Sequence, residues 1–114
     1  MLHADESSNG QDVTLSRGET LEIRLGENAS TGYRWIVSEE SKRTWSHTIR
    51  ELEEKTAAPV GPPGRGGSRF LFFEAVADGN AEIEIHYARS WEKGKPPGRT
   101  FRLHVHVHSA ASGT

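Results

Sequence analysis

The stretch ENASTGYRW, residues 27–35, places a run of small polar residues directly before two aromatic side chains. Residues 28–32 offer almost no apolar surface to bury, which is typical of a loop. Tyr33 and Trp35 flank the charged Arg34, and alternation of this kind indicates a strand with one buried face. We therefore predict a polar loop that leads directly into a strand, with both aromatic side chains packed in the core beneath the loop.

The same alternation recurs on both sides of this stretch. Leu21, Ile23 and Leu25 are separated by charged residues, as expected for an antiparallel strand that buries one face. Residues 69–77, RFLFFEAVA, are more continuously apolar and are typical of a central strand. Further segments with a period of two lie at residues 13–15, 33–37, 83–87 and 101–107.

The expected fold is an all-β, immunoglobulin-like antiparallel sandwich of about seven to eight strands. The chain of 114 residues has the length of one domain, which we place at residues 12–108. Residues 1–11 are expected to be a flexible N-terminal segment, and residues 109–114, SAASGT, a flexible tail. The sequence contains no cysteine, so packing alone must hold the two sheets together.

One segment fits two structures. In residues 44–55, TWSHTIRELEEK, the side chains of Trp45, Ile49 and Leu52 have helical spacing. A strand bordered by a charged turn fits the same residues. Because the neighbouring segments are predicted strands, we favour a strand here.

The composition excludes several classes of protein. The mean hydropathy is −0.67, and no segment approaches the roughly 20 apolar residues that a membrane span needs. The absence of cysteine excludes thiolate metal sites and a cysteine nucleophile. The first ten residues, MLHADESSNG, lack the apolar run of a signal peptide. The sequence leaves the localisation open: the protein is periplasmic or secreted if a signal peptide was removed, and otherwise it is cytoplasmic.

Three glycine-rich segments join the predicted strands, at residues 27–32, 57–68 and 89–99. In an immunoglobulin-like sandwich they connect strands B and C, D and E, and F and G. Each strand reverses the direction of the chain, so these connections share one end of the sandwich. Loops on a rigid scaffold commonly carry recognition. We therefore predict a binding surface at this end.

The three loops carry motifs that resemble those of a known family. Residues 28–35, NASTGYRW, resemble the N-P-x-T-G-Y-x-W motif of the chagasin-like inhibitors of papain-type cysteine peptidases. Residues 64–67, GRGG, match that family's G-x-G-G loop, and residues 89–91, RSW, resemble its R-P-W loop. The order and spacing agree from about residue 13 to residue 107. The resemblance implies that the peptidase is bound by Asn28, Ala29, Ser30, Thr31, Gly32, Gly64, Arg65, Gly66, Gly67, Arg89, Ser90 and Trp91.

The resemblance further implies a reversible, non-covalent protein inhibitor and not an enzyme. Loop 27–32 would be the central wedge near the catalytic Cys and His of the peptidase. Loop 57–68 would lie along the unprimed side of the cleft, and loop 89–99 would contact the primed side. The expected partner is a papain-like cysteine peptidase. We expect no cofactor, metal, nucleic acid or membrane partner, and a monomer when the protein is free.

The chemistry of the first loop agrees with this role. Small side chains at Ser30 and Thr31 let the backbone enter a narrow cleft, and Gly32 is the expected position of a positive φ. Two residues depart from the family pattern. Ala29 and Ser90 stand where the family has proline, so both loops lose a restriction on φ.

Three alternative functions fit parts of the sequence. His104, His106 and His108 fall on one face of a predicted strand and offer a metal site, although we favour a polar outer face. The GRGG segment and a basic loop end offer a nucleic-acid or phosphate site, but the G-K-[ST] ending of a P-loop is missing. An immunoglobulin-like binding or adhesion module without a peptidase target is the third. The basic residues at the loop end are Arg65, Arg69, Arg89, Lys93, Lys95 and Arg99.

Overall fold

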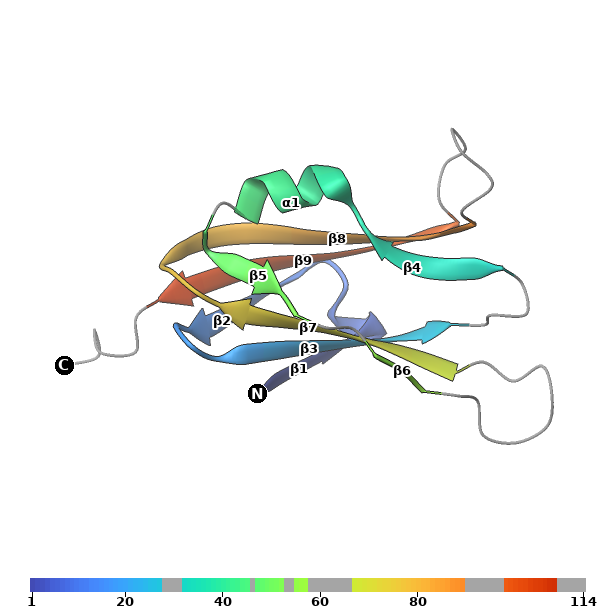
Figure 1. The fold of residues 1–114 in the computed structure, drawn as a ribbon, viewed down its shortest axis with the longest axis horizontal. Coiled ribbons are helices and arrows are strands. Elements are labelled where there is room, and N and C mark those ends of the chain that lie inside the picture. The colour runs from blue at the N-terminus through green and yellow to red at the C-terminus, as the bar shows by residue number, and fades with distance from the viewer. Residues whose placement is uncertain (28–31, 46, 53–54, 58–66, 90–97, 109–114) are drawn as a thin grey trace.

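Two sheets stacked face to face form the molecule in this computed structural model, which describes residues 1–27, 32–45, 47–52, 55–57, 67–89 and 98–108 (Figure 1). The first sheet has the order β1-β3-β7-β5, with β6 also paired to β7, and the second has the order β2-β9-β8-β4. The predicted all-β, immunoglobulin-like sandwich is thus confirmed. The elements within the described residues are β1 (Leu2–Asp5), η1 (Glu6–Ser8), β2 (Gln11–Ser16), β3 (Thr20–Glu27), β4 (Tyr33–Val37), α1 (Glu39–Trp45), β5 (Ile49–Glu51), β6 (Lys55–Ala57), β7 (Gly67–Ala75), β8 (Gly79–Arg89) and β9 (Arg99–His108).

The longest strands form antiparallel pairs whose register turns the predicted apolar face of each strand inward. In the first sheet, Ile23 of β3 lies opposite Leu71 of β7. In the second, Ile83 of β8 lies opposite Leu103 of β9. All four side chains are buried. β7 pairs with β3, β5 and β6, which confirms its predicted central position.

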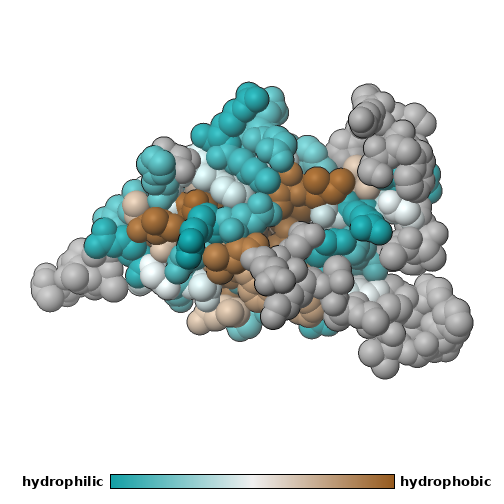
Figure 2. All heavy atoms as spheres, in the orientation of Figure 1, coloured by the Kyte–Doolittle hydropathy of each residue, from teal (hydrophilic) through white to brown (hydrophobic). Residues whose placement is uncertain are grey.

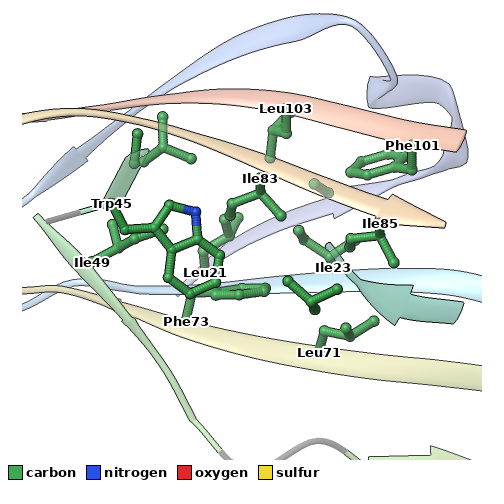
Figure 3. Close-up of a cluster of buried hydrophobic side chains, with 14 of the residues drawn as sticks. Leu21, Ile23, Trp45, Ile49, Leu71, Phe73, Ile83, Ile85, Phe101 and Leu103 are labelled. Atoms are coloured by element: carbon green, nitrogen blue, oxygen red, sulfur yellow. The ribbon is translucent and has the colours of Figure 1, made fainter. Parts of the chain in front are cut away.

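The core fills the space between the two sheets, as Figure 3 shows. Leu21 and Phe73 of the first sheet face Ile85 and Phe101 of the second, and none of these side chains is more than 2% exposed. Because apolar area removed from water is the main favourable term in folding, this layer holds the sheets together without a disulfide.

The N-terminal residues are paired, which corrects the flexible segment predicted for residues 1–11. β1 pairs in parallel with β3 in the first sheet. After the turn η1, β2 pairs in parallel with β9 in the second sheet. Ala4 is buried, and the Asp5 carboxylate accepts a hydrogen bond from the Ser7 N–H at 2.9 Å, which caps the turn. This short segment contributes a strand because β3 offers it an unpaired edge. The predicted tail, residues 109–114, lies outside the described residues.

The segment that fitted two structures contains the end of a helix as well as a strand, so the predicted strand over residues 44–55 is only partly right. α1 ends at Trp45, and β5 begins at Ile49. The Trp45 ring meets Phe73 edge to face at 5.6 Å, and its Nε1 donates to the Glu82 carbonyl at 2.7 Å. The helical spacing and the strand pattern therefore each described one part of the segment.

The surface of the described residues is mainly polar. Figure 2 shows hydrophilic side chains over most of one face, with apolar atoms gathered between α1 and the lower sheet. The described large apolar side chains that are exposed are Met1, Ile36 and Val76. In this part of the chain, no helix is long and apolar enough to cross a membrane.

Candidate functional site

The strand ends that carry the three loops lie side by side at one end of the sandwich, as predicted (Figure 1). Glu27, at the end of β3, lies opposite Gly67, the first residue of β7. Tyr33, which begins β4, lies opposite Arg89, the last residue of β8. Arg99, which begins β9, lies opposite Tyr87. The bases of loops 27–32, 57–68 and 89–99 are thus joined by strand pairing.

Three of the predicted binding residues lie within the described part of the chain. Gly32 has a φ of 80°, which confirms the predicted left-handed conformation at the end of the first loop. Gly67 begins β7, and Arg89 ends β8 with its guanidinium 4.4 Å from the centre of the Tyr33 ring. The other predicted binding residues lie outside the described residues, namely Asn28, Ala29, Ser30, Thr31, Gly64, Arg65, Gly66, Ser90 and Trp91.

Stacked aromatic rings connect the bases of the first and third loops. Tyr87 lies between Tyr33 and Trp35, with ring centres 5.1 and 4.8 Å apart. Trp35 is 3% exposed, as predicted for a core residue. Tyr33 is half-buried, which corrects its predicted place in the core. Its ring stacks on Tyr87 and lies beside the Arg89 guanidinium.

Trp35 also fixes the strand that leads into the first loop. Its indole Nε1 donates a hydrogen bond to the Gly26 carbonyl at 2.8 Å. Its backbone N–H donates to the Glu27 carboxylate at 3.1 Å. β3 and β4 belong to different sheets, so these two bonds join the sheets directly below the loop.

Trp35→Phe should lower the free energy of unfolding by about 1–3 kcal/mol, because the Gly26 carbonyl loses its donor at a partly buried position. Urea unfolding measures this loss. Trp45→Phe is the matched control, since it removes an indole bond to Glu82 away from the loops. Only Trp35→Phe should speed hydrogen exchange at residues 26–27 and 33–35. Equal exchange rates there in both variants would contradict this role.

A buried ion pair joins the bases of the first and second loops. Arg69 Nε lies 3.0 and 3.2 Å from the two carboxylate oxygens of Glu27. The two side chains are only 9% and 8% exposed. Sequence reasoning placed Arg69 among the basic residues of the loop end and missed its pairing with Glu27. The pair follows from the register of β3 with β7, which brings Glu27 opposite Gly67, two residues before Arg69.

The third loop is tied to the same base through Arg99. Its guanidinium lies 5.4 Å from the centre of the Trp35 ring. It also donates through Nη2 to the Glu6 carboxylate at 2.9 Å. Arg69 and Arg99 therefore both contact the loop bases. Arg69 is buried there, which corrects its predicted place in the basic surface of the loop end, while the Arg99 side chain is 54% exposed.

The histidines proposed as an alternative metal site lie on the outer face of the second sheet with separate partners. His104 Nε2 lies 3.2 Å from Glu82, and His106 Nδ1 lies 2.5 Å from Asn80 Oδ1. His108 is exposed. Among the residues that the structure describes, no three or more His, Asp or Glu side chains are grouped to hold a metal ion. This geometry gives the metal-binding alternative no support.

An ionic network occupies the same outer face closer to the loops. The Glu84 carboxylate accepts from Arg102 Nε at 2.9 Å and contacts His86 Nε2 at 2.6 Å. Hydrogen bonds from Arg102 and then from His86 hold the pKa of Glu84 below its usual range. These charges satisfy one another across neighbouring strands and do not converge on a pocket.

The sequence matches a family of known inhibitors. The family model described as Chagasin family peptidase inhibitor I42 matches residues 14–105. Amoebiasin-1 of Entamoeba histolytica is 32% identical over 102 residues, which is 90% of this chain and 95% of that protein.

Solved structures share the fold. The crystal structure of the cysteine protease inhibitor EhICP2 from Entamoeba histolytica superposes with a TM-score of 0.77 at 24% identity, covering 94% of each chain. PbICP-C, whose structure was solved in complex with falcipain-2, superposes with a TM-score of 0.61 at 18% identity. That match covers 93% of this chain and 89% of the other.

Proposed function

The chain belongs to the chagasin family of peptidase inhibitors and inhibits papain-family cysteine peptidases; we propose that it does so reversibly and without covalent chemistry, by inserting three loops into the active-site cleft. The loops are residues 27–32, 57–68 and 89–99. The protein is an inhibitor and not an enzyme. The proposed contacts are those of the twelve binding residues that the family motifs single out.

The observation that carries the proposal is the joining of all three loop bases at one end of a rigid sandwich. The buried pair of Glu27 and Arg69 links the first and second loops. The stack of Tyr33, Tyr87 and Trp35 links the first and third. Loops held at both ends lose less conformational freedom when they bind, so more of the contact energy appears as affinity.

Each of the three loops has a role that follows from its position at this end of the sandwich. The first loop leaves from the middle of the shared base, between the other two, and acts as the wedge at the catalytic Cys and His of the peptidase. The second loop follows the unprimed side and the third follows the primed side. The small residues Ser30, Thr31 and Gly32 allow the wedge backbone to approach closely.

Steady-state kinetics with papain and with trypsin test this proposal. Inhibition of papain should be competitive with substrate, while trypsin, a serine peptidase, should be affected weakly. Mass spectrometry after long incubation with papain should find the three loops uncleaved. Equal inhibition of both peptidases, or rapid cleavage within residues 27–32, would contradict the proposed mode of binding.

Restoring proline at Ala29 or Ser90 should tighten inhibition of papain by about two- to fivefold, because the free loop then has fewer conformations to lose. Arg89 belongs to β8 and is extended, as the residue before a proline must be. Asn28, which precedes Ala29, lies outside the described residues. Progress curves of inhibition give the dissociation rates in which most of the gain should appear. Weaker inhibition would mean that the replaced residue's amide donates a hydrogen bond within its loop.

A further inference from the structure

The N-terminal turn η1 lies next to the loop bases and outside residues 14–105, which the family model matches. It follows β1 of the first sheet and precedes β2 of the second, so the chain crosses between the sheets here (Figure 1). A side chain of this turn that contacts both sheets therefore ties them together.

Glu6 makes this contact with one carboxylate. Its Oε1 accepts a hydrogen bond from the Gly26 backbone N–H at 2.7 Å, and its Oε2 accepts one from Arg99 Nη2 at 2.9 Å. Gly26 belongs to β3, just before the first loop, and Arg99 begins β9, just after the third. One side chain thus joins the bases of two loops.

The surroundings of Glu6 fit this contact closely. A Cβ atom at Gly26 would lie 3.0 Å from Glu6 Oε1, so the carboxylate approaches β3 where no side chain intervenes. Asn9 strengthens the same crossing, because its Oδ1 accepts from the Arg102 backbone N–H at 2.8 Å. The turn is therefore fastened to both sheets.

We propose that Glu6 is a positioning residue of the inhibitor: its carboxylate holds the bases of the first and third loops in the relative position that the peptidase cleft requires. This inference rests on the proposed function and extends the functional part of the molecule to the N-terminal turn. Restricting the two strand ends in the free protein lowers the ordering cost of binding.

Protonation of Glu6 removes its charge and weakens the link. The Gly26 N–H, followed by Arg99, holds the pKa of the Glu6 carboxyl below its ordinary value of 4.5. Two further charged groups lie beside it, namely Asp5 at the end of β1 and Arg24 of β3. Both line a pocket together with Glu6 and Gly26. Because folding lowers this pKa, the link is complete above about pH 4.5 and is lost as the pH falls through the lower pKa of the folded protein.

The test measures the inhibition constant for papain with Glu6→Ala and with a matched control, Glu74→Ala. Glu74 accepts from Arg50 at 2.6 Å at the opposite end of β7, away from the loops. Glu6→Ala should weaken inhibition by about three- to tenfold, mainly through faster dissociation. The inhibition constant of Glu74→Ala should stay within about twofold of that of the original protein. Thermal unfolding of each variant corrects for any unfolded fraction.

Gly26→Ala supplies a second test that keeps every charge. The methyl group added at position 26 would press on the Glu6 carboxylate. The single variant Gly26→Ala should therefore weaken inhibition of papain. In a protein that already carries Glu6→Ala, the same substitution should have little further effect on inhibition. The ratio of inhibition constants between Glu6→Ala and the original protein should also approach one as the pH falls through the lowered pKa of Glu6. Because both constants are measured with the same papain at the same pH, the titration of papain itself cancels in this ratio.

Each result decides between the two claims. Failure of the original protein to inhibit papain would overturn the proposed function and this inference with it. Inhibition of papain by the original protein and by Glu6→Ala with equal constants would overturn the inference alone. The inference would also be overturned if Gly26→Ala weakened inhibition of papain by the same factor in the original protein and in the Glu6→Ala variant.

Discussion

Arg69→Met should lower the free energy of unfolding by about 3–5 kcal/mol. The substitution leaves the Glu27 carboxylate buried without the guanidinium that donates to both of its oxygens. Both side chains are less than a tenth exposed, so water does not easily replace the lost partner. Urea unfolding followed by tryptophan fluorescence measures the change.

Two comparisons make this prediction specific. Arg50→Met breaks the exposed pair with Glu74, where Arg50 is 65% exposed, and should cost less than about 1 kcal/mol. Adding Glu27→Gln to Arg69→Met should recover part of the loss, because the unpaired buried charge is then removed. A cost for Arg69→Met no greater than that for Arg50→Met would contradict a structural role for the buried pair.

Trp91→Ala should weaken inhibition of papain by about 30-fold or more while leaving the thermal unfolding temperature unchanged. An aromatic side chain that anchors an interface commonly contributes about 2 kcal/mol or more to binding. Trp91 lies outside the described residues, and the prediction rests on the RSW motif within a loop rich in Gly, Pro and Lys. Inhibition constants and thermal unfolding are measured on the same preparations.

Trp45→Ala is the control for Trp91→Ala, because it removes a tryptophan from the core and not from a loop. Trp45 is 5% exposed and packs against Phe73, so its removal should lower the unfolding temperature strongly. If Trp91→Ala destabilised the protein in the same way and left inhibition unchanged after correction for unfolding, Trp91 would be a core residue. The third binding loop would then be wrongly placed.

The strands could be predicted because their information is local. Leu21, Ile23 and Leu25 lie on one face of any extended chain, whatever partner that chain has. The loops could be predicted for a similar reason. Gly32 tolerates a positive φ that most residues avoid, and its φ of 80° in the structure agrees.

The features that the sequence did not reveal depend on pairing between distant segments. The contact of Glu27 with Arg69 follows from the register of β3 and β7, which alternation alone does not specify. The strand at Leu2–Asp5 forms because β3 offers it an edge. α1 has only seven residues, too few for helical spacing to distinguish it clearly from a strand.

Titration of active papain with this protein tests the central claim most directly. At papain concentrations well above the dissociation constant, residual activity should fall in proportion to added protein, reach zero near one inhibitor per active site, and return on dilution. This result would show a reversible block of the active site by one domain. Undiminished papain activity at micromolar concentrations of the protein would contradict the account.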